Sequence, residues 1–523
     1  MKSYIMLAIT TLAAVFLSSC AFPFSMQPGA NRLRCDIPYA VGNLDPQFSA
    51  DPYARMILAN IGEGLVRINP DGTVIPGAAQ QYTVSPDGTV YTFHLRKSGG
   101  RAGKEPQAVT SHDFVFALGR IFSAGRASPF AEDFAAVKNA RAVLDGALPA
   151  GELGIAAVDD YTLTITLEQR SPFFLHALAS TAAMPCNRDN FEQSRGRYGL
   201  EKQFVPSNGP FFLDGWTENL LTLRPNPNYN GEGELPSSAV YLDIGKEDPA
   251  ARFFAGDTDF IRLADFAAVQ RAREAGAQLT GHQTTTWAIV FNQNDPVWGN
   301  PFMRQGLAYA ADRSDFEGRL PENLAPTSYI IPPAAMLADK SFRTLAPAPS
   351  PMEYDAQRAR HLFAMGMEQL GLDALPATDL YVPVGSGHAA NMGIIQSSWQ
   401  NTLGVYINIA AIPPEEISER LGTGDFRLML MPIVPENEKA HTALNFSRGR
   451  FGYNNPRVDE LISYGINAAD LNTAVFRISQ AERTLLADAV AIPAYHETTY
   501  FAAGKDAHGA TPSPFGGMVY FGG

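Results

Sequence analysis

Hydrophobic and polar residues alternate along several short segments of the chain, which predicts half-buried strands. In 91–96, Tyr-Thr-Phe-His-Leu-Arg, every second residue is apolar, and the same period of two recurs in 162–167. Apolar residues spaced by three and four predict amphipathic helices in 52–61 and 111–121. The Asp-Gly pair at 87–88 predicts a turn between two strands.

The second half of the chain alternates between strand and helix patterns. A strand is predicted at 287–292 and a helix at 301–311, where Pro301 occupies the first turn. Such alternation predicts an α/β lobe with a mixed sheet. The further predicted helices are 355–365 and 392–403, and the further strands are 379–383 and 405–410.

The first residues have the pattern of an export signal. Lys2 precedes an apolar run over 5–16, which is too short to span a bilayer, and the small residues Ser18 and Ser19 precede Cys20. This arrangement resembles a bacterial lipoprotein signal, which implies removal of residues 1–19 and a diacylglyceryl group on Cys20. An ordinary signal peptide cleaved nearby is the alternative. Residues 20–30, with two prolines, are predicted to form a lipidated tether.

Length, charge and motifs exclude several classes of protein. A chain of 523 residues exceeds what one hydrophobic core serves, so two to four lobes are expected. The formal charge of −13 argues against a nucleic acid partner. The 9 His residues are scattered, and no serine-nucleophile elbow, phosphate loop or zinc-protease motif is present. We therefore expect no metal, no cofactor and no enzymatic activity.

Two cysteines remain after Cys20. Cys35 and Cys186 form an even pair, and in the oxidising compartment that the export signal predicts they permit one disulfide. Two separate buried thiols are the alternative.

Several short motifs occur in a fixed order along the chain. In this order they resemble the extracytoplasmic solute-binding proteins of ABC importers, in the family that takes up peptides, nickel and related solutes. The stretch 127–166 is particularly similar to the oligopeptide-binding branch. The motifs are Leu-Asp-Pro at 44–46, Gly-Glu-Gly-Leu-Val at 62–66, Ser-Pro-Asp-Gly at 85–88, Val-Asp-Asp-Tyr-Thr at 158–162, Ser-Asn-Gly-Pro-Phe at 207–211, Gln-Gly-Leu-Ala-Tyr-Ala-Ala-Asp-Arg at 305–313 and Tyr-Asn-Asn-Pro-Arg-Val-Asp-Glu-Leu at 453–461.

The resemblance implies a bilobal α/β fold of the periplasmic-binding-protein type, with mixed sheets, an additional α+β lobe and a ligand cleft between lobes. It places Cys35 and Cys186 in the same lobe, which supports their pairing. The implied divisions are lobe one at 31–62, 185–283 and 490–523, lobe two, a family-specific insertion, at 63–184, and lobe three at 284–489.

The resemblance also implies where a ligand binds. An extended peptide can add as a strand to an exposed edge, because main-chain hydrogen bonds are indifferent to side chains. One edge is expected at Ser49, Ala50 and Asp51, and the other at Ile433 and Val434, after the strand 426–431.

This second edge departs from the family pattern of a Trp followed by an Asp that pairs with the ligand's ammonium. Ile433 replaces the Trp, and Glu436 falls where the Asp is expected. Pro435 removes an amide donor. We expect Glu436 to contact a cationic group of the ligand, with a solvated loop acid as the alternative. The aromatic side chains predicted to line the cleft, with a place in the core as the alternative, are Trp287, Phe291, Trp399 and Tyr406.

Together these observations predict a lipid-anchored, monomeric receptor that closes around an oligopeptide and presents it to an inner-membrane permease and its ATPase subunits. We expect it in the cell envelope, on the periplasmic side or at the cell surface. The alternatives keep the fold and change the role: binding of a nickel complex, haem, an opine or an oligosaccharide, or an envelope peptide chaperone or sensor.

Overall fold

The computed structural model describes most of the chain beyond residue 31. No helix within this described part is long and apolar enough to cross a membrane. The predicted signal peptide, Cys20 and the tether lie outside it. The described residues are 32–69, 73–97, 99–102, 105–123, 128–231, 238–263, 265–346, 352–385, 387–505, 507, 510–512 and 519–520.

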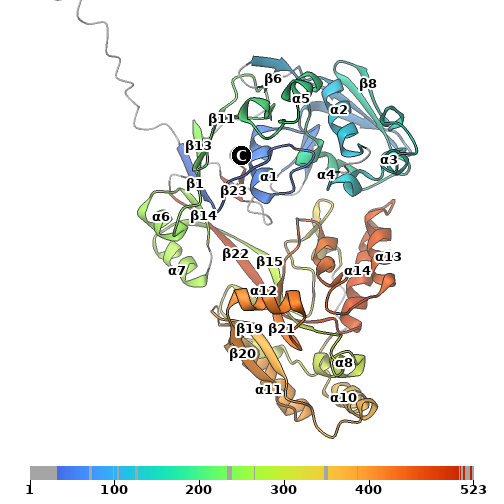
Figure 1. Ribbon diagram of the computed structural model, residues 1–523, viewed down its shortest axis with the longest axis vertical. Helices are drawn as coiled ribbons and strands as arrows, with labels where there is room; N and C mark the ends of the chain where they lie inside the picture. The colour runs from blue at the N-terminus through green and yellow to red at the C-terminus, as the bar shows by residue number, and fades with distance from the viewer. Residues whose placement is uncertain are drawn as a thin grey trace, which may run out of the picture.

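One eleven-stranded sheet extends through most of the molecule (Figure 1). The sheet is mixed. β1 is parallel to β13 and, at a single pair of residues, to β14, and β19 is parallel to β20 and β21. The other neighbouring strands in this sheet pair antiparallel. In spatial order the strands are β11 (Phe211–Trp216), β12 (Leu220–Pro225), β13 (Ala239–Ile244), β1 (Arg32–Ile37), β14 (Phe260–Arg262), β22 (Ala491–Ala503), β15 (Gln278–Phe291), β21 (Leu428–Ile433), β19 (Asp379–Pro383) and β20 (Asn408–Ile412), with β16 (Leu324–Pro326) paired to β22.

Two long strands, β15 and β22, connect the two ends of this sheet. They pair antiparallel from Gln278 opposite Ala503 to Val290 opposite Ala491. One end of β22 continues into the upper part of the molecule through β14, and the other end of β15 continues into the lower part through β21 (Figure 1). The register between them shifts twice, which increases local twist.

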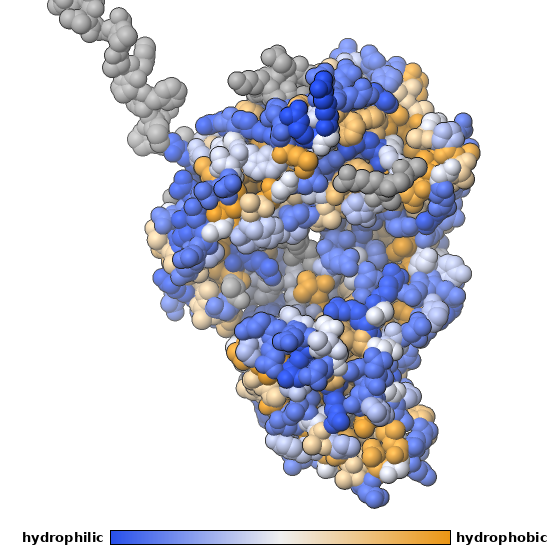
Figure 2. Space-filling view, viewed as in Figure 1, coloured by the Kyte–Doolittle hydropathy of each residue, from blue (hydrophilic) through white to orange (hydrophobic). Residues whose placement is uncertain are grey.

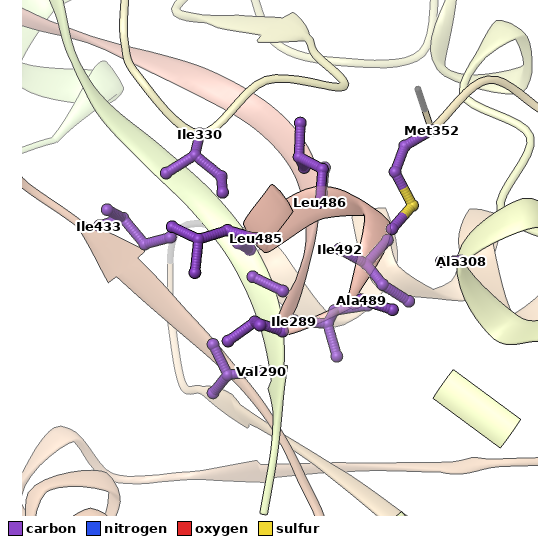
Figure 3. Packing of buried hydrophobic residues seen from close by; sticks show 14 of the residues in the cluster. Ile289, Val290, Ala308, Ile330, Met352, Ile433, Leu485, Leu486, Ala489 and Ile492 are labelled. Atoms are coloured by element: carbon purple, nitrogen blue, oxygen red, sulfur yellow. The ribbon is translucent and has the colours of Figure 1, made fainter. Parts of the chain in front are cut away.

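Three large hydrophobic cores, with two small clusters beside them, lie along this framework. We name the surrounding parts of the molecule after them: lobe one has its core residues in 33–61, 184–260 and 501–507, lobe two in 65–183, and lobe three in 288–495. Figure 3 shows part of the lobe three core, in which Ile289 of β15 lies opposite Ile492 of β22, with Leu485 of α14 in the same cluster. Each lobe thus buries its own apolar surface.

Lobe three contains the longest helices, and glycines let two of them approach closely. A Cβ on Gly306 of α8 would lie 2.8 Å from Phe363 Cβ of α10, so a larger residue there would push these helices apart. The helices of lobe three are α8 (Pro301–Tyr309), α9 (Phe342–Leu345), α10 (Ala356–Leu370), α11 (His388–Leu403), α12 (Pro414–Thr423), α13 (Pro456–Ile466) and α14 (Leu471–Ala487), with the 3-10 helix η6 (Ala440–Ser447).

Lobe two is built on a four-stranded antiparallel sheet, and the predicted alternation in its strands is confirmed. Tyr91, Phe93 and Leu95 of β5 are buried, whereas the residues between them are half-exposed. Helix α2 begins at Ser111, as predicted, because Thr110 and Asp113 form a capping box. The main elements are β4 (Ala79–Val84), β5 (Val90–Leu95), β9 (Thr162–Thr166), β8 (Ile155–Asp159), α2 (Ser111–Ile121), α3 (Ala140–Leu144), α4 (Phe174–Leu178) and η1 (Ala131–Phe134).

Small sheets and shorter helices complete the molecule. Helix α1 spans the predicted residues, with Pro52 in its first turn. The remaining α-helices and strands are α1 (Pro52–Ile61), α5 (Arg188–Ser194), α6 (Pro249–Ala255), α7 (Phe266–Glu274), β2 (Val66–Ile68), β3 (Val74–Pro76), β6 (Gly99–Ala102), β7 (Glu105–Ala108), β10 (Pro206–Ser207), β17 (Met336–Leu337), β18 (Lys340–Ser341), β23 (Thr511–Pro512) and β24 (Val519–Tyr520).

A buried ion pair ties lobe two to lobe one. Arg120 of α2 donates through Nη2 to Asp45 Oδ2 at 2.5 Å and through Nη1 to Gln47 Oε1 at 2.6 Å. Its guanidinium also lies over the rings of Phe191 and Tyr198, at 4.3 Å and 4.9 Å from their centroids. The Leu-Asp-Pro motif therefore supplies the anion that holds this junction.

The predicted disulfide is wrong, because Cys35 and Cys186 are both free and face different clusters. Cys35 lies on β1 in the core of lobe one, whereas Cys186 packs beside Tyr198, with its Sγ 3.5 Å from Arg120 Nη1. Burial raises the pKa of the Cys186 thiol to about 11. The alternative of two separate buried thiols describes this structure.

Candidate functional site

The molecule is hollowed between its upper part, formed by lobes one and two, and its lower part, formed by lobe three (Figure 2). Lobe two reaches lobe three at the rim. Lys439 Nζ lies 2.5 Å from Asp133 Oδ1, and the Gln169 side chain donates to the Asn467 carbonyl at 2.7 Å. Arg170 Nε donates to the carbonyl of Ala469 at 3.0 Å. Lobes two and three are thus in contact at two places, the α13–α14 loop and the segment before η6.

The first predicted edge is largely used by the fold itself. The Ser49 side chain is buried and its amide donates to the Asp45 carbonyl, so neither is available to a ligand. Asp51 caps α1: its Oδ1 accepts from the Ala54 amide and its Oδ2 from the Tyr39 hydroxyl, both at 2.8 Å. The predicted ligand contacts at Ser49 and Asp51 are therefore not supported by the geometry, whereas Ala50 is exposed.

The second predicted edge is partly open. β21 pairs with β19 only at Leu428 and Met429, and its next residues have no further partner on that side within the described part of the chain. Ile433 is buried in the core of lobe three, so its side chain is not a cleft residue as predicted. Val434 is 53% exposed. Glu436 is exposed as well.

Three of the four aromatic side chains predicted for the cleft lie elsewhere. Trp399 is fully buried in lobe three, where its indole N–H donates to the Leu307 carbonyl at 2.9 Å. Phe291 is fully buried in the same core. Tyr406 is exposed on the turn before β20, the edge strand farthest from lobe one. These predictions are wrong because α11 packs Trp399 into the core, β15 places Phe291 in the same core, and Tyr406 lies just before the edge strand β20.

Trp287 remains at the crossing between lobes. Pro326, Tyr495, Trp287 and Pro432 lie directly opposite one another on four adjacent strands, β16, β22, β15 and β21. Residues opposite one another share a face of the sheet. The outer two, Pro326 and Pro432, are exposed, Trp287 is half-buried and Tyr495 is buried. This face is thus exposed at its two outer strands, and on the β21 side the exposed Pro432 lies directly beside the half-buried Trp287.

A carboxylate and an imidazole flank Trp287. Its Nε1–H donates to Glu497 Oε2 at 2.6 Å, and the His388 ring lies 4.0 Å from its own ring, centroid to centroid. His388 Nδ1 is 2.7 Å from the Tyr495 hydroxyl. Burial lowers the pKa of His388 to about 4, so this imidazole is neutral at pH 7.

Sequence reasoning missed Glu497 and His388. The available signal for Glu497 was an acidic residue two positions after the apolar run 491–495. Only the pairing of β22 with β15 shows that this carboxylate meets Trp287, some 200 residues away in the chain.

Two other features lie apart from this face. A recess of about 370 Å³ lies between α13 and α14, lined by residues such as Arg457, Gln480 and Arg483, and it includes no residue predicted for the cleft. Among the residues that the structure describes, no group of three or more His, Cys, Asp or Glu side chains is placed to hold a metal ion.

Comparison with known proteins gives the family. Residues 73–497 match the model of the bacterial extracellular solute-binding proteins, family 5. A dipeptide-binding protein of Lactococcus lactis is 25% identical over 441 residues, which cover 81% of this chain and 79% of that protein. A probable deoxycholate-binding periplasmic protein of Escherichia coli, YgiS, is 25% identical over 470 residues, covering 87% of this chain and 86% of that protein.

Solved structures agree in fold. The structure of OppA from Burkholderia pseudomallei superposes with a TM-score of 0.69 at 22% identity and covers 94% of this chain and 98% of that one. The expected α/β fold of the periplasmic-binding-protein type is confirmed. The chain belongs to family 5 of the bacterial extracellular solute-binding proteins, and it is a binding protein rather than an enzyme.

Proposed function

We propose that this protein is the lipid-anchored substrate-binding component of an ABC importer and that it binds oligopeptides by closing its lobes around them. The observation that carries the proposal is the pair β15 and β22, two long strands that connect lobes one and three in a member of a solute-binding family. Two antiparallel strands with shifted register can bend and twist without breaking either lobe's core.

Closure would move lobes one and two together against lobe three. The Arg120–Asp45 ion pair supports joint movement of lobes one and two, since it is buried at their junction. We propose as moving units the divisions expected from the sequence, with changes of lobe near 62–63, 184–185 and 283–284. The last change, expected at 489–490, falls instead after Tyr495, because Ile492 and Tyr495 pack in the core of lobe three. A solute bound between the lobes shifts the open and closed populations only if it contacts both sides.

Peptide binding is supported by the open edge of β21 and by relatives named for dipeptides and oligopeptides. Ala50 and Val434 are the exposed members of the two predicted edges, and we propose that they face the peptide main chain. Glu436 is proposed as a rim carboxylate near the same edge.

We propose that Cys20 carries the lipid anchor and that the receptor works as a monomer in the cell envelope. It would deliver its cargo to an inner-membrane permease driven by ATPase subunits. The proposal draws on the lipoprotein-like start of the sequence and on the family.

A non-peptide cargo is the second candidate. Pro432 and Pro435 cannot donate main-chain hydrogen bonds, so the second edge offers fewer of them to a peptide than an ordinary strand. One relative of similar identity is named a probable deoxycholate-binding protein.

Native mass spectrometry of the full-length protein, purified from its own envelope without denaturation, tests the proposal. We expect adducts that fragment as peptides and a covalent mass at Cys20 that matches a diacylglyceryl cysteine. A single non-peptide adduct would contradict oligopeptide binding and favour the second candidate. A mature start at another residue would contradict the anchor.

A further inference from the structure

We propose that Glu497 and Trp287 form a subsite for a cationic group of the solute, either a primary ammonium or a guanidinium. The inference rests on the proposed function and names the chemistry of the cargo. It places the anchoring carboxylate on β22, in place of the Glu436 that the sequence indicated.

The subsite is held in place by the two connecting strands. The 2.6 Å hydrogen bond from Trp287 Nε1 fixes one oxygen of Glu497 and with it the orientation of the carboxylate. The register between β15 and β22 shifts between Gln283 and Thr285 and again after Trp287. These irregularities lie on either side of Trp287 along β15, and its indole meets the Glu497 carboxylate between them.

Within the described part of the chain, the Glu497 carboxylate has no cationic partner. No described Lys, Arg or His nitrogen lies within 4.0 Å of it, and its second oxygen, Oε1, accepts from no described group. The neighbouring His388 ring is neutral at pH 7, because burial lowers its pKa. A half-buried carboxylate without a counter-ion favours a cation more than an exposed one, since water and salt screen it less.

The face that carries the pair is accessible from the open edge of β21. Pro432 lies opposite Trp287 on this face and is exposed, as is Val434 two residues further along. A long cationic side chain on a peptide that follows this edge would extend across β21 and β15 toward Trp287 and Glu497. The carboxylate would accept a charged hydrogen bond, and the indole face would contact the cation.

Glu436 and Glu497 differ in how far their carboxylates are buried. Glu436 is exposed on the segment after β21, where screening reduces the value of an ion pair. Glu497 is half-buried between β15 and β16 and is already oriented by a tryptophan. The two acids therefore differ in what they contribute to specificity, and Glu497 contributes the selective contact.

Calorimetry with a matched peptide series tests this subsite. The probes are tetra-alanine and, at each of its four positions in turn, a lysine or the isosteric but uncharged norleucine. We expect one lysine position at which the protein binds about tenfold or more tightly than the norleucine counterpart, as for a charged hydrogen bond. In Glu497→Gln this preference falls below about threefold, while affinity for tetra-alanine changes little. Glu415→Gln, a matched loss of charge on exposed helix α12, keeps the preference.

The outcomes separate the subsite from the proposed function. Peptide binding without any lysine preference, or a preference that survives in Glu497→Gln, would overturn the subsite and leave peptide binding intact. No binding of any tetrapeptide would overturn peptide binding itself. If Glu497→Gln has the same melting temperature as the parent protein, its loss of lysine preference is an effect on recognition and not on folding. The comparison of lysine with norleucine peptides in the parent protein tests the preference without any variant.

Discussion

At the residue scale, Arg120 makes the most concentrated set of contacts between lobes one and two. Its guanidinium donates to Asp45 and Gln47 and lies over the aromatic rings of Phe191 and Tyr198 in a buried setting. Removal of such a cation leaves its carboxylate partner buried and unpaired, which costs more than the pair itself contributes.

We therefore expect Arg120→Met to destabilise the protein strongly. Loss of one partner of a buried pair costs about 3 to 5 kcal/mol, which for a chain of this length corresponds to a fall in Tm of about 3 to 5 °C. Differential scanning calorimetry measures it. Arg141→Met is the matched control, since Arg141 pairs with Glu132 in a largely exposed position and its loss should shift Tm by less than about 2 °C. Equal shifts in the two variants would contradict the role assigned to Arg120.

Single residues were the hardest to predict from sequence. The pattern around Trp399 correctly indicated a helix, but it did not reveal that α8 lies against that face and receives the indole N–H. Glu436 was selected by its distance from a strand, whereas Glu497 becomes relevant only through a partner on another strand. Burial and partners depend on contacts distant in sequence, and local pattern does not encode them.

At the element scale, strongly patterned segments were predicted well. α1 and β19 have the predicted bounds, and α2 begins and ends where its apolar stripe does. The strand predicted at 287–292 covers only the last residues of β15, which begins at Gln278 and ends at Phe291. The earlier residues are polar, Thr and Gln among them, and they form a strand because β22 pairs with them. Long-range pairing extended what local pattern indicated.

The contact between η1 and the segment before η6 gives an element-scale prediction. Lys439→Met removes the ion pair with Asp133 between lobes two and three, which should favour the open form. The pair is partly exposed, so we expect a loss of about 0.5 to 1 kcal/mol, or a twofold to fivefold weaker binding of the tightest tetrapeptide. Titration calorimetry at low and high salt measures this, and the difference between parent and variant should shrink at high salt.

The matched control for this contact is Arg448→Met. Arg448 pairs with Asp459 at 2.8 Å, but both residues belong to lobe three. Its loss should leave tetrapeptide affinity unchanged. If the two variants weakened binding equally, the Lys439 pair would not be a contact specific to the closed form.

At the scale of the whole molecule, three large cores and one shared sheet define the architecture. Patterning predicted several lobes and mixed sheets, but it could not show that β1, β14 and β22 meet in one lobe from distant parts of the chain. The order of the short motifs indicated the family, and the family in turn implied a lobe assembled from distant parts of the chain. The match of residues 73–497 to the family model confirms the family. The connection through β15 and β22 then indicates where relative movement of the lobes is possible.

Small-angle X-ray scattering of the purified protein, alone and saturated with the tightest-binding tetrapeptide, tests the central claim most directly. The claim is that lobe three closes against lobes one and two around the solute. We predict a smaller radius of gyration and a shorter maximum dimension in the saturated sample. Identical scattering curves, under conditions in which calorimetry shows the same sample to be fully bound, would contradict the account.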